Sequence, residues 1–167
     1  KALYLGPLKA LINDQYLRLE SLGAATGISV HRWHGDVSSG HKRQVIKNPN
    51  GVLLITPESL EALFVREGHR IAAVFSSLQY VVIDELHTFR GVFGSHVAHV
   101  LRRLRRLCAR YGADPTFVFA SATIGDPSGL ASALIGAPVA EVTDDGSPRG
   151  ERLVALWNPT LVDAGSG

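Results

Sequence analysis

Short apolar runs alternate along the chain with longer stretches in which apolar residues recur every three to four positions. Runs such as Val52–Ile55 are apolar throughout, as strands are when a sheet is covered on both faces. The longer stretches have the period of a helix that buries one side. Strands alternating with helices predict an α/β fold, in which a mostly parallel sheet lies between two layers of helices.

This pattern predicts the individual elements. It indicates strands over 28–33, 52–55, 78–83, 116–120, 139–142 and 153–157, with a further short apolar run at 2–5. It indicates helices over 8–25, 38–47, 59–65, 95–111 and 127–135. Residues 144–150 are polar and rich in turn formers, and residues 163–167 have the composition of a tail.

Composition bounds the size and setting of the protein. The 167 residues are 46% hydrophobic and 19% charged, which is enough apolar material for the core of one domain. The 17 basic and 15 acidic side chains leave a net charge of only +2, so a nucleic-acid site must be a local patch. The single cysteine excludes an internal disulfide. The chain has no long apolar run and no leader, so we expect no membrane contact and a cytoplasmic location.

Polar clusters stand directly after three of the apolar runs. They are Thr56-Pro57, Asp84-Glu85 and Ser121-Ala122-Thr123. Parallel α/β sheets bind their ligands at the carboxyl ends of the strands, which is where these clusters lie. The sequence therefore predicts a functional site at that edge of the sheet.

The acidic pair suggests phosphate chemistry. A carboxylate at the end of a buried strand is held rigidly, and Asp84 could hold Mg²⁺ mostly through its water shell, with Glu85 beside it. Glu85 could orient or deprotonate a water molecule aimed at a γ-phosphate. His87 could link this site to a moving part of the protein. The alternative is a loop of solvated acids after a core strand.

Four segments together resemble a known family. Asp84-Glu85-Leu86-His87 resembles the DExH box of superfamily-2 helicases, and Ser121-Ala122-Thr123 is similar to their motif III. Pro7-Leu8-Lys9-Ala10-Leu11 with Gln15 resembles motif Ia, and Thr56-Pro57-Glu58 resembles motif Ib. The motifs occur in the family's order. The resemblance implies the first RecA-like domain of a helicase core, a three-layer α/β fold that uses ATP and Mg²⁺.

The resemblance also implies roles for single residues. The nucleotide site would comprise Asp84, Glu85, His87, Ser121 and Thr123, with the last three coupling nucleotide state to domain closure. Phosphate and sugar of a nucleic acid would be bound by Pro7, Lys9, Gly35, Thr56 and Pro57. The implied partner is single-stranded or partly duplex DNA, with RNA as the open alternative. Translocation from 3′ to 5′ and a role in DNA repair are implied in the same way.

Two branches of the superfamily share features with the chain. From His87 onward, including Asp145-Gly-Ser-Pro and Trp157-Asn-Pro159, it resembles the repair helicases related to the bacterial mitomycin-repair factor and the yeast RecQ-four-like enzyme. Before Asp84, including His34-Gly-Asp36, it looks more like the large helicase-related (Lhr-type) branch. The motifs therefore define the superfamily more clearly than the branch, because the two halves of the chain resemble different branches.

A phosphate cradle of the form G-x-x-x-x-G-K-[ST] is missing. In the nearest segment, 35–43, the lysine is displaced by one residue and Arg43 stands where a Mg²⁺-binding hydroxyl is needed. The chain also begins at Lys1 and contains no methionine. We therefore expect an N-terminally truncated domain at 1–143 and the start of a linker toward a second RecA-like domain at 144–167. Such a piece would not hydrolyse ATP alone. A non-catalytic nucleic-acid-binding remnant and an unrelated Mg-dependent α/β ATPase are the alternatives.

The arginines of the predicted helix 95–111 form a second basic feature. They lie outside the apolar arc of the helix and are Arg102, Arg103, Arg105, Arg106 and Arg110. They could bind phosphates. The favoured interpretation is a solvated face or a surface that docks a neighbouring domain.

Overall fold

The computed structural model describes residues 1–68, 71–122, 124–142, 146, 150–151 and 153–157. In this part of the chain a parallel sheet of five strands has the order β2-β3-β1-β4-β5. The strands are β1 (Ala2–Leu5), β2 (Val30–Trp33), β3 (Val52–Ile55), β4 (Tyr80–Ile83) and β5 (Thr116–Phe119). The parallel pairing confirms the predicted α/β fold.

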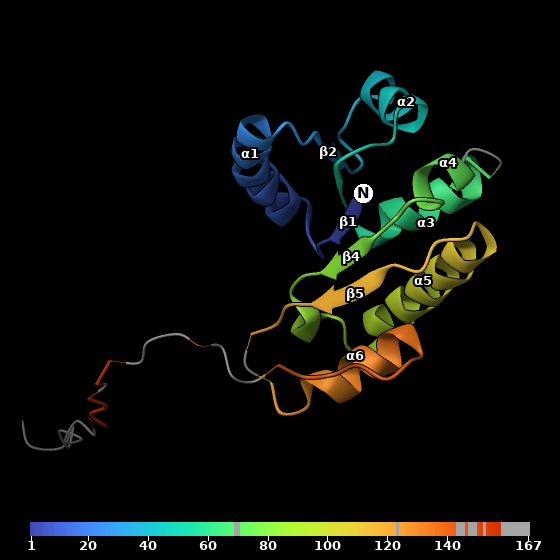
Figure 1. The fold of residues 1–167 in the computed structure, drawn as a ribbon. Coiled ribbons are helices and arrows are strands. Elements are labelled where there is room, and N and C mark those ends of the chain that lie inside the picture. The colour runs from blue at the N-terminus through green and yellow to red at the C-terminus, as the bar shows by residue number, and fades with distance from the viewer. Residues whose placement is uncertain (69–70, 123, 143–145, 147–149, 152, 158–167) are drawn as a thin grey trace, which may run out of the picture.

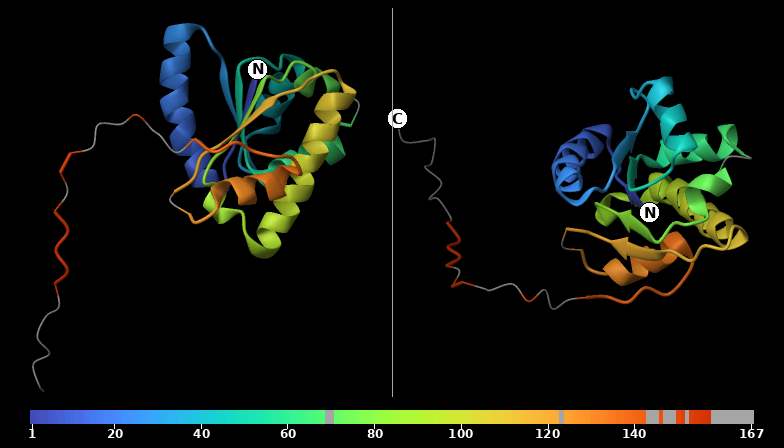
Figure 2. Two further views of the ribbon diagram at one scale, coloured as in Figure 1. Left: turned by 60° about the horizontal axis from the view of Figure 1, so that its bottom comes forward. Right: turned by 45° about the horizontal axis from the view of Figure 1, so that its top comes forward.

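Helices connect the strands and form the outer layers. They are α1 (Lys9–Thr26), α2 (Ser39–Lys47), α3 (Pro57–Arg66), α4 (Ile71–Phe75), the 3₁₀ helix η1 (Leu86–Thr88), α5 (Gly91–Arg110) and α6 (Pro127–Ile135). Helix α1 packs against β2 and β3, whereas α5 packs with α3 and α6 on the other side of the sheet (Figure 1). Figure 2 shows α1 and α5 on opposite sides of the strands. The domain therefore has three layers.

The strands end level with one another. Leu5 is in register with Ile55 on one side and with Ile83 on the other, and Ile83 is in register with Phe119. Trp33 at the end of β2 is in register with Ile55. Because all strands run parallel, the residues that follow them emerge along a single edge of the sheet, which is where the predicted polar clusters lie.

One face of the sheet is closed and the other is partly open. Leu3 and Ile83 are buried in the core shared with α5. On the opposite face Tyr80 and Val118 are 53% and 44% exposed, because α1 covers only the β2–β3 side. Parallel sheets are normally covered on both faces, so the face over β4 and β5 lacks a layer within the described residues.

Some predicted elements are wrong. Residues 139–142 and 153–157, which the pattern indicated as strands, are irregular among the described residues, and β5 ends the sheet. The Val139 N–H donates to the Ser132 hydroxyl at 3.1 Å, which ties that segment to α6 instead of the sheet. Leu153 and Leu156 are fully exposed and have no core to join. The predicted tail at 163–167 lies outside the described residues.

The helices differ from the pattern in two places. Helix α4 was not predicted, because its five residues are too few for a helical period. Helix α5 begins at Gly91 rather than at residue 95, since Gly91 and Gly94 are weak helix formers that hid its first turn. No helix in the described ranges has both the length and the apolarity to cross a membrane.

Candidate functional site

The predicted site residues lie along the carboxyl edge of the sheet in two adjacent groups. Following the strand order, the segments after β2, β3 and β1 carry the residues predicted to bind nucleic acid. The segments after β4 and β5 carry those predicted to act on the nucleotide. The first group lies entirely before Asp84 in the sequence, and the strand order places the two groups on adjacent halves of the same sheet edge.

Asp84 follows β4 and has both carboxylate oxygens engaged. The Tyr4 hydroxyl, from the neighbouring strand β1, donates to Oδ2, and the Glu85 N–H donates to Oδ1 at 2.9 Å. Burial first, and then the Asp84 carboxylate, raise the pKa of Tyr4 far above its ordinary value, so its hydroxyl remains a donor. Sequence reasoning missed Tyr4, because its position beside Asp84 depends on a register between strands far apart in the chain.

Glu85 has left-handed backbone angles, with φ 55° and ψ 43°. This conformation costs a non-glycine residue about 1–3 kcal/mol and is held by several hydrogen bonds around the turn. The Leu86 N–H donates to the Ala120 carbonyl at 2.9 Å, across to the end of β5. The N–H and hydroxyl of Thr88 both donate to the Glu85 carbonyl at 2.8 Å. The turn is thereby fixed, while the Glu85 carboxylate stays partly exposed.

His87 bridges the segments that follow β4 and β5. Its Nδ1 lies 3.3 Å from Oε2 of Glu85 and accepts a hydrogen bond from the Ala122 N–H at 3.4 Å. The structure thus brings the predicted coupling residue against both the acidic turn and the Ser-Ala segment. Ser121 is exposed at this edge, and Thr123 lies outside the described residues.

The carboxylates of this group limit how a cation would bind. Among the described residues, no set of three or more His, Cys, Asp or Glu side chains is arranged to hold a metal ion. Asp84 and Glu85 alone are too few to enclose a cation. Hard oxygen donors at this position suit Mg²⁺, which keeps several water ligands and binds substrate phosphates. The residues present therefore fit a Mg²⁺ ion held mainly through water.

Lys9 and Gly35 form the exposed part of the second group. The Lys9 amine lies 3.2 Å from Oδ1 of Asp36, and a Cβ placed on Gly35 would be 3.3 Å from the Lys9 Nζ. Glycine at position 35 therefore lets the lysine lie close over the turn after β2. Pro7 is half-buried at the entry to α1.

Thr56 and Pro57 have a more structural environment. Both are buried, and the Thr56 hydroxyl donates to Oε1 of Glu58 at 2.7 Å and lies 3.0 Å from the Ser59 hydroxyl. Pro57 occupies the first turn of α3, where its missing N–H costs nothing. These two residues shape the loop after β3, and Glu58 is its exposed side chain.

Asn13 was not predicted and joins this group through a contact with His34. The His34 ring is buried, with Nε2 3.1 Å from Oδ1 of Asn13, and Arg32 donates to the same oxygen at 2.9 Å. Burial is the main cause that lowers the pKa of His34, so the ring is neutral at neutral pH and its Nε2–H is the donor. The contact ties α1 to the turn that contains Gly35.

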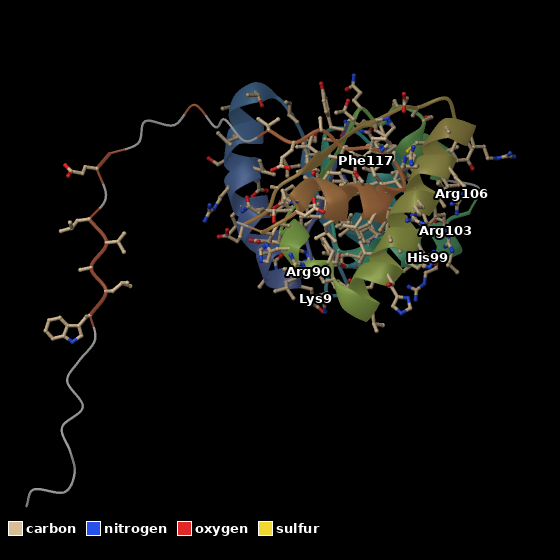
Figure 3. The ribbon with its side chains drawn as sticks, turned by 90° about the horizontal axis from the view of Figure 1, so that it is seen from below. Lys9, Arg90, His99, Arg103, Arg106 and Phe117 are labelled. Atoms are coloured by element: carbon tan, nitrogen blue, oxygen red, sulfur yellow. The ribbon has the colours of Figure 1, made fainter. Side chains whose placement is uncertain are left out.

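The α5 arginines mostly hold the domain together. Arg102 donates to the Ala133 carbonyl, Arg103 to Glu61, and Arg105 to the Ile135 carbonyl at 2.7 Å. Figure 3 shows Arg103 and Arg106 in a row with His99 along α5. Three of the five arginines therefore have acceptors on α3 and α6 of the same domain.

A three-layer α/β domain with an acidic turn and a basic loop on one sheet edge has the form of a RecA-like motor domain. The DEAD/DEAH box helicase family model matches residues 1–129, and the chain belongs to this family.

The relatives match most of the chain and are much longer than it, so the chain spans about a fifth of their length. The uncharacterized ATP-dependent helicase YprA of Bacillus subtilis is 41% identical over 165 residues, which are 98% of this chain and 22% of YprA. The crystal structure of the DUF1998 helicase MrfA bound to DNA and AMPPNP matches with a TM-score of 0.82 and 42% identity over 90% of this chain and 21% of MrfA. The Mycobacterium smegmatis helicase Lhr bound to ssDNA and AMP-PNP matches with a TM-score of 0.66 and 29% identity over 79% of this chain and 18% of Lhr.

These comparisons confirm the predicted family and both resemblances. The match to YprA extends over 98% of the chain, so a single relative spans the segments before and after Asp84. An origin of the two halves in different branches is therefore not needed to explain the sequence.

Proposed function

We propose that this chain is the part of an ATP-dependent DNA helicase that carries motifs Ia, Ib, II and III and couples ATP hydrolysis to translocation on DNA. The observation that carries the proposal is that the residues predicted for the nucleotide and those predicted for the nucleic acid lie on adjacent halves of one sheet edge. A ligand bound at one half of the edge lies beside a ligand bound at the other half, as coupling between them requires. The ligands of the MrfA structure, DNA and AMPPNP, are of these two kinds.

In this proposal Asp84 holds Mg²⁺ through water, and the bound ion neutralises charge on the phosphates. Tyr4 and the Glu85 N–H keep the Asp84 carboxylate in one orientation. Glu85 orients the attacking water and accepts its proton, which its partial exposure permits.

His87, Ser121 and Thr123 are proposed to couple the nucleotide to the rest of the motor. The support is the position of His87, whose Nδ1 contacts both Glu85 and the Ala122 N–H. A change in the charge or position of Glu85 would alter the contact between His87 and the segment after β5. That segment would pass the change on to a second RecA-like domain.

Pro7, Lys9, Gly35, Thr56 and Pro57 are proposed to form the DNA track. Lys9 contributes charge, and the close turn at Gly35 allows a strand to approach the backbone. Thr56 and Pro57 act by fixing the loop that precedes α3. Contacts of this kind are made to phosphate and sugar, so binding is independent of sequence and weakens with salt.

The proposed domain division is 1–143 as a partial RecA-like domain and 144–167 as the start of a linker to the second. Support for a missing phosphate-binding unit comes from the open sheet face over β4 and β5, where Val118 is exposed. The outer edge of β5 also has no partner strand among the described residues. A function in DNA repair and a cytoplasmic location complete the proposal.

ATP hydrolysis by the 167-residue chain and by the full-length protein that carries it tests this function. We expect no turnover by the chain alone, and DNA-stimulated turnover by the full-length protein that Glu85→Gln abolishes. Turnover by the chain alone, lost on Glu85→Gln, would overturn the domain division. If DNA does not stimulate ATP hydrolysis by the full-length protein, the proposed helicase function is overturned.

A further inference from the structure

A cleft of about 620 Å³ lies between α2 and α3, on the side of the domain where β2 and β3 end. Its volume is in the range of small-molecule and nucleotide sites. Four cationic side chains line it: Lys9, Lys42, Arg43 and Arg66. None of the last three belongs to a segment that resembles a helicase motif.

The cleft concentrates positive charge. Glu58 and Glu67 are the two carboxylates in its lining. Glu58 accepts a hydrogen bond from the Thr56 hydroxyl. The whole chain has a net charge of only +2, so a cleft with four cations against two carboxylates stands out as the local patch that a polyanion requires.

Lys9 pairs with Asp36, whereas the other three cations are available to a ligand. Arg43 and Arg66 are exposed, and within the described part of the chain neither forms an ion pair with a carboxylate. The Lys42 amine lies 5.8 Å from the centroid of the Trp33 ring, which holds it at the wall of the cleft without neutralising it. Arg102, Arg103 and Arg105 of α5 differ, because protein acceptors already occupy them.

The cleft is continuous with the proposed DNA track. Lys9 and Gly35 belong to both, and Ser59 in the cleft contacts Thr56 of the loop after β3. A strand that lies over Lys9 and Gly35 therefore reaches the opening between α2 and α3.

We propose that the α2–α3 cleft is a further phosphate-binding subsite for the DNA strand, with Arg43 and Arg66 as its main phosphate contacts and Lys42 as a third. The proposal rests on the proposed function and extends its track by residues outside the helicase motifs. Charge-assisted contacts of this kind carry no sequence information, so the subsite raises affinity for any single strand.

The test uses the full-length protein with the double substitution Arg43→Gln and Arg66→Gln. Binding of a fluorescent oligothymidylate is measured by anisotropy at several salt concentrations. Each lost phosphate contact on a single strand lowers the salt slope by about 0.7, so the double variant should lose about 1.4. In 0.1 M salt the same counterion release corresponds to about fivefold weaker binding for each contact and about 25-fold for both.

The matched control is Lys47→Gln with Arg110→Gln. It removes the same charge from exposed positions on α2 and α5 outside the cleft, and it should leave the salt slope unchanged. A control that weakens binding as much as the cleft variant would mean that net charge alone matters, and would overturn the subsite. Thermal unfolding confirms that all variants fold.

Lys9→Gln distinguishes a failure of the proposed subsite from a failure of the proposed function on which it rests. If Lys9→Gln weakens binding while the Arg43/Arg66 variant binds like the wild type, the track ends at the turn after β2. The subsite is then wrong and the proposed function stands. If the wild-type protein does not bind the oligothymidylate, both fail.

Discussion

The Tyr4 hydroxyl donates a hydrogen bond to Oδ2 of Asp84, which directly follows β4, the strand beside the β1 strand of Tyr4. The Glu85 N–H occupies the other carboxylate oxygen, so the carboxylate is held in one orientation. Tyr4 contacts the Asp84 carboxylate. It is a positioning residue for the side chain that we propose to hold Mg²⁺ through water.

Tyr4→Phe tests this role, because it keeps the ring and removes the donor. We expect the Mg²⁺ concentration for half-maximal ATPase activity of the full-length protein to rise about tenfold, as losses of supporting hydrogen bonds at metal sites do. The rate at saturating Mg²⁺ should change little. Binding of a fluorescent ATP analogue at graded Mg²⁺ gives a readout that does not depend on turnover.

Tyr80→Phe is the control for this substitution, since Tyr80 lies on β4 with its side chain exposed. It should leave the Mg²⁺ dependence unchanged. An unaltered Mg²⁺ requirement in Tyr4→Phe would show that the Glu85 N–H alone orients Asp84.

The sequence alone was sufficient to locate the acidic turn. An apolar run that changes abruptly to Asp84-Glu85 indicates the end of a strand. The strand ends of a parallel sheet share an edge. Tyr4 could not be found in this way. Its contact with Asp84 depends on the pairing of β1 with β4, which are separated by most of the other elements.

The motif at Thr56 shows a different limit. The sequence places it in the loop after β3, but local pattern does not say which way a threonine faces. The structure turns its hydroxyl inward to Glu58 and Ser59.

Arg105 shows a similar limit. Helical periodicity excluded it from the apolar arc of α5, but its acceptor, the Ile135 carbonyl, belongs to a helix that only tertiary packing brings near.

The predicted strand at 139–142 failed for a third reason. An apolar run becomes a strand only where a sheet edge is available in the right direction, and composition carries no information on that. Here the chain leaves α6 with the Val139 N–H bonded to Ser132, so the segment stays with the helix layer.

Gly94→Ala should destabilise the domain. A Cβ on Gly94 would be 2.4 Å from the Phe89 carbonyl oxygen, which is backbone and cannot move aside cheaply. Overpacking of this kind costs about 1–3 kcal/mol, and here it would shift the start of α5 against the segment that carries His87. Urea unfolding of the chain measures the loss of unfolding free energy.

Gly40→Ala is the matched control for that substitution. Gly40 is also in a helix, α2, but a Cβ there would meet nothing within 4 Å. We expect unchanged stability or a gain of up to about 1 kcal/mol, because alanine favours helices. Equal stability of the two variants would contradict the close approach at Gly94.

Acid pH should lower the unfolding free energy through His41. Burial first, and then the charges of His31 and Arg32, lower the pKa of His41. The unfolded chain has the ordinary pKa of about 6.5, so as pH falls below that value the unfolded state takes up the proton first. Stability is therefore complete above pH of about 6.5 and declines below it, by at most about 1.4 kcal/mol for each pH unit.

Urea unfolding at pH 7.5 and at about 5.5 measures this effect in the wild type and in His41→Gln. The variant should lose less stability on acidification, since it has removed one group that resists protonation in the folded state. His99→Gln, which changes an exposed ring on α5, should keep the wild-type difference. A His41→Gln profile that parallels the wild type would mean that His41 protonates equally in both states.

Cys108 should report on global unfolding, because its thiol is buried on the apolar side of α5 and burial, with a smaller effect of Asp114, raises its pKa to about 11. The thiolate is the reactive form, so at pH 8 its fraction is about 100-fold lower than that of an ordinary thiol, before access is considered. We expect a maleimide to leave the native chain unlabelled and to label it fully in urea, at the site of the single cysteine.

Ser95→Cys is the control, because it places a second thiol at an exposed position of the same helix. This thiol should react at once in the native state. If Cys108 in the native chain reacted as fast as that surface thiol, α5 would have to leave the sheet frequently, which its packing against α3 and α6 opposes.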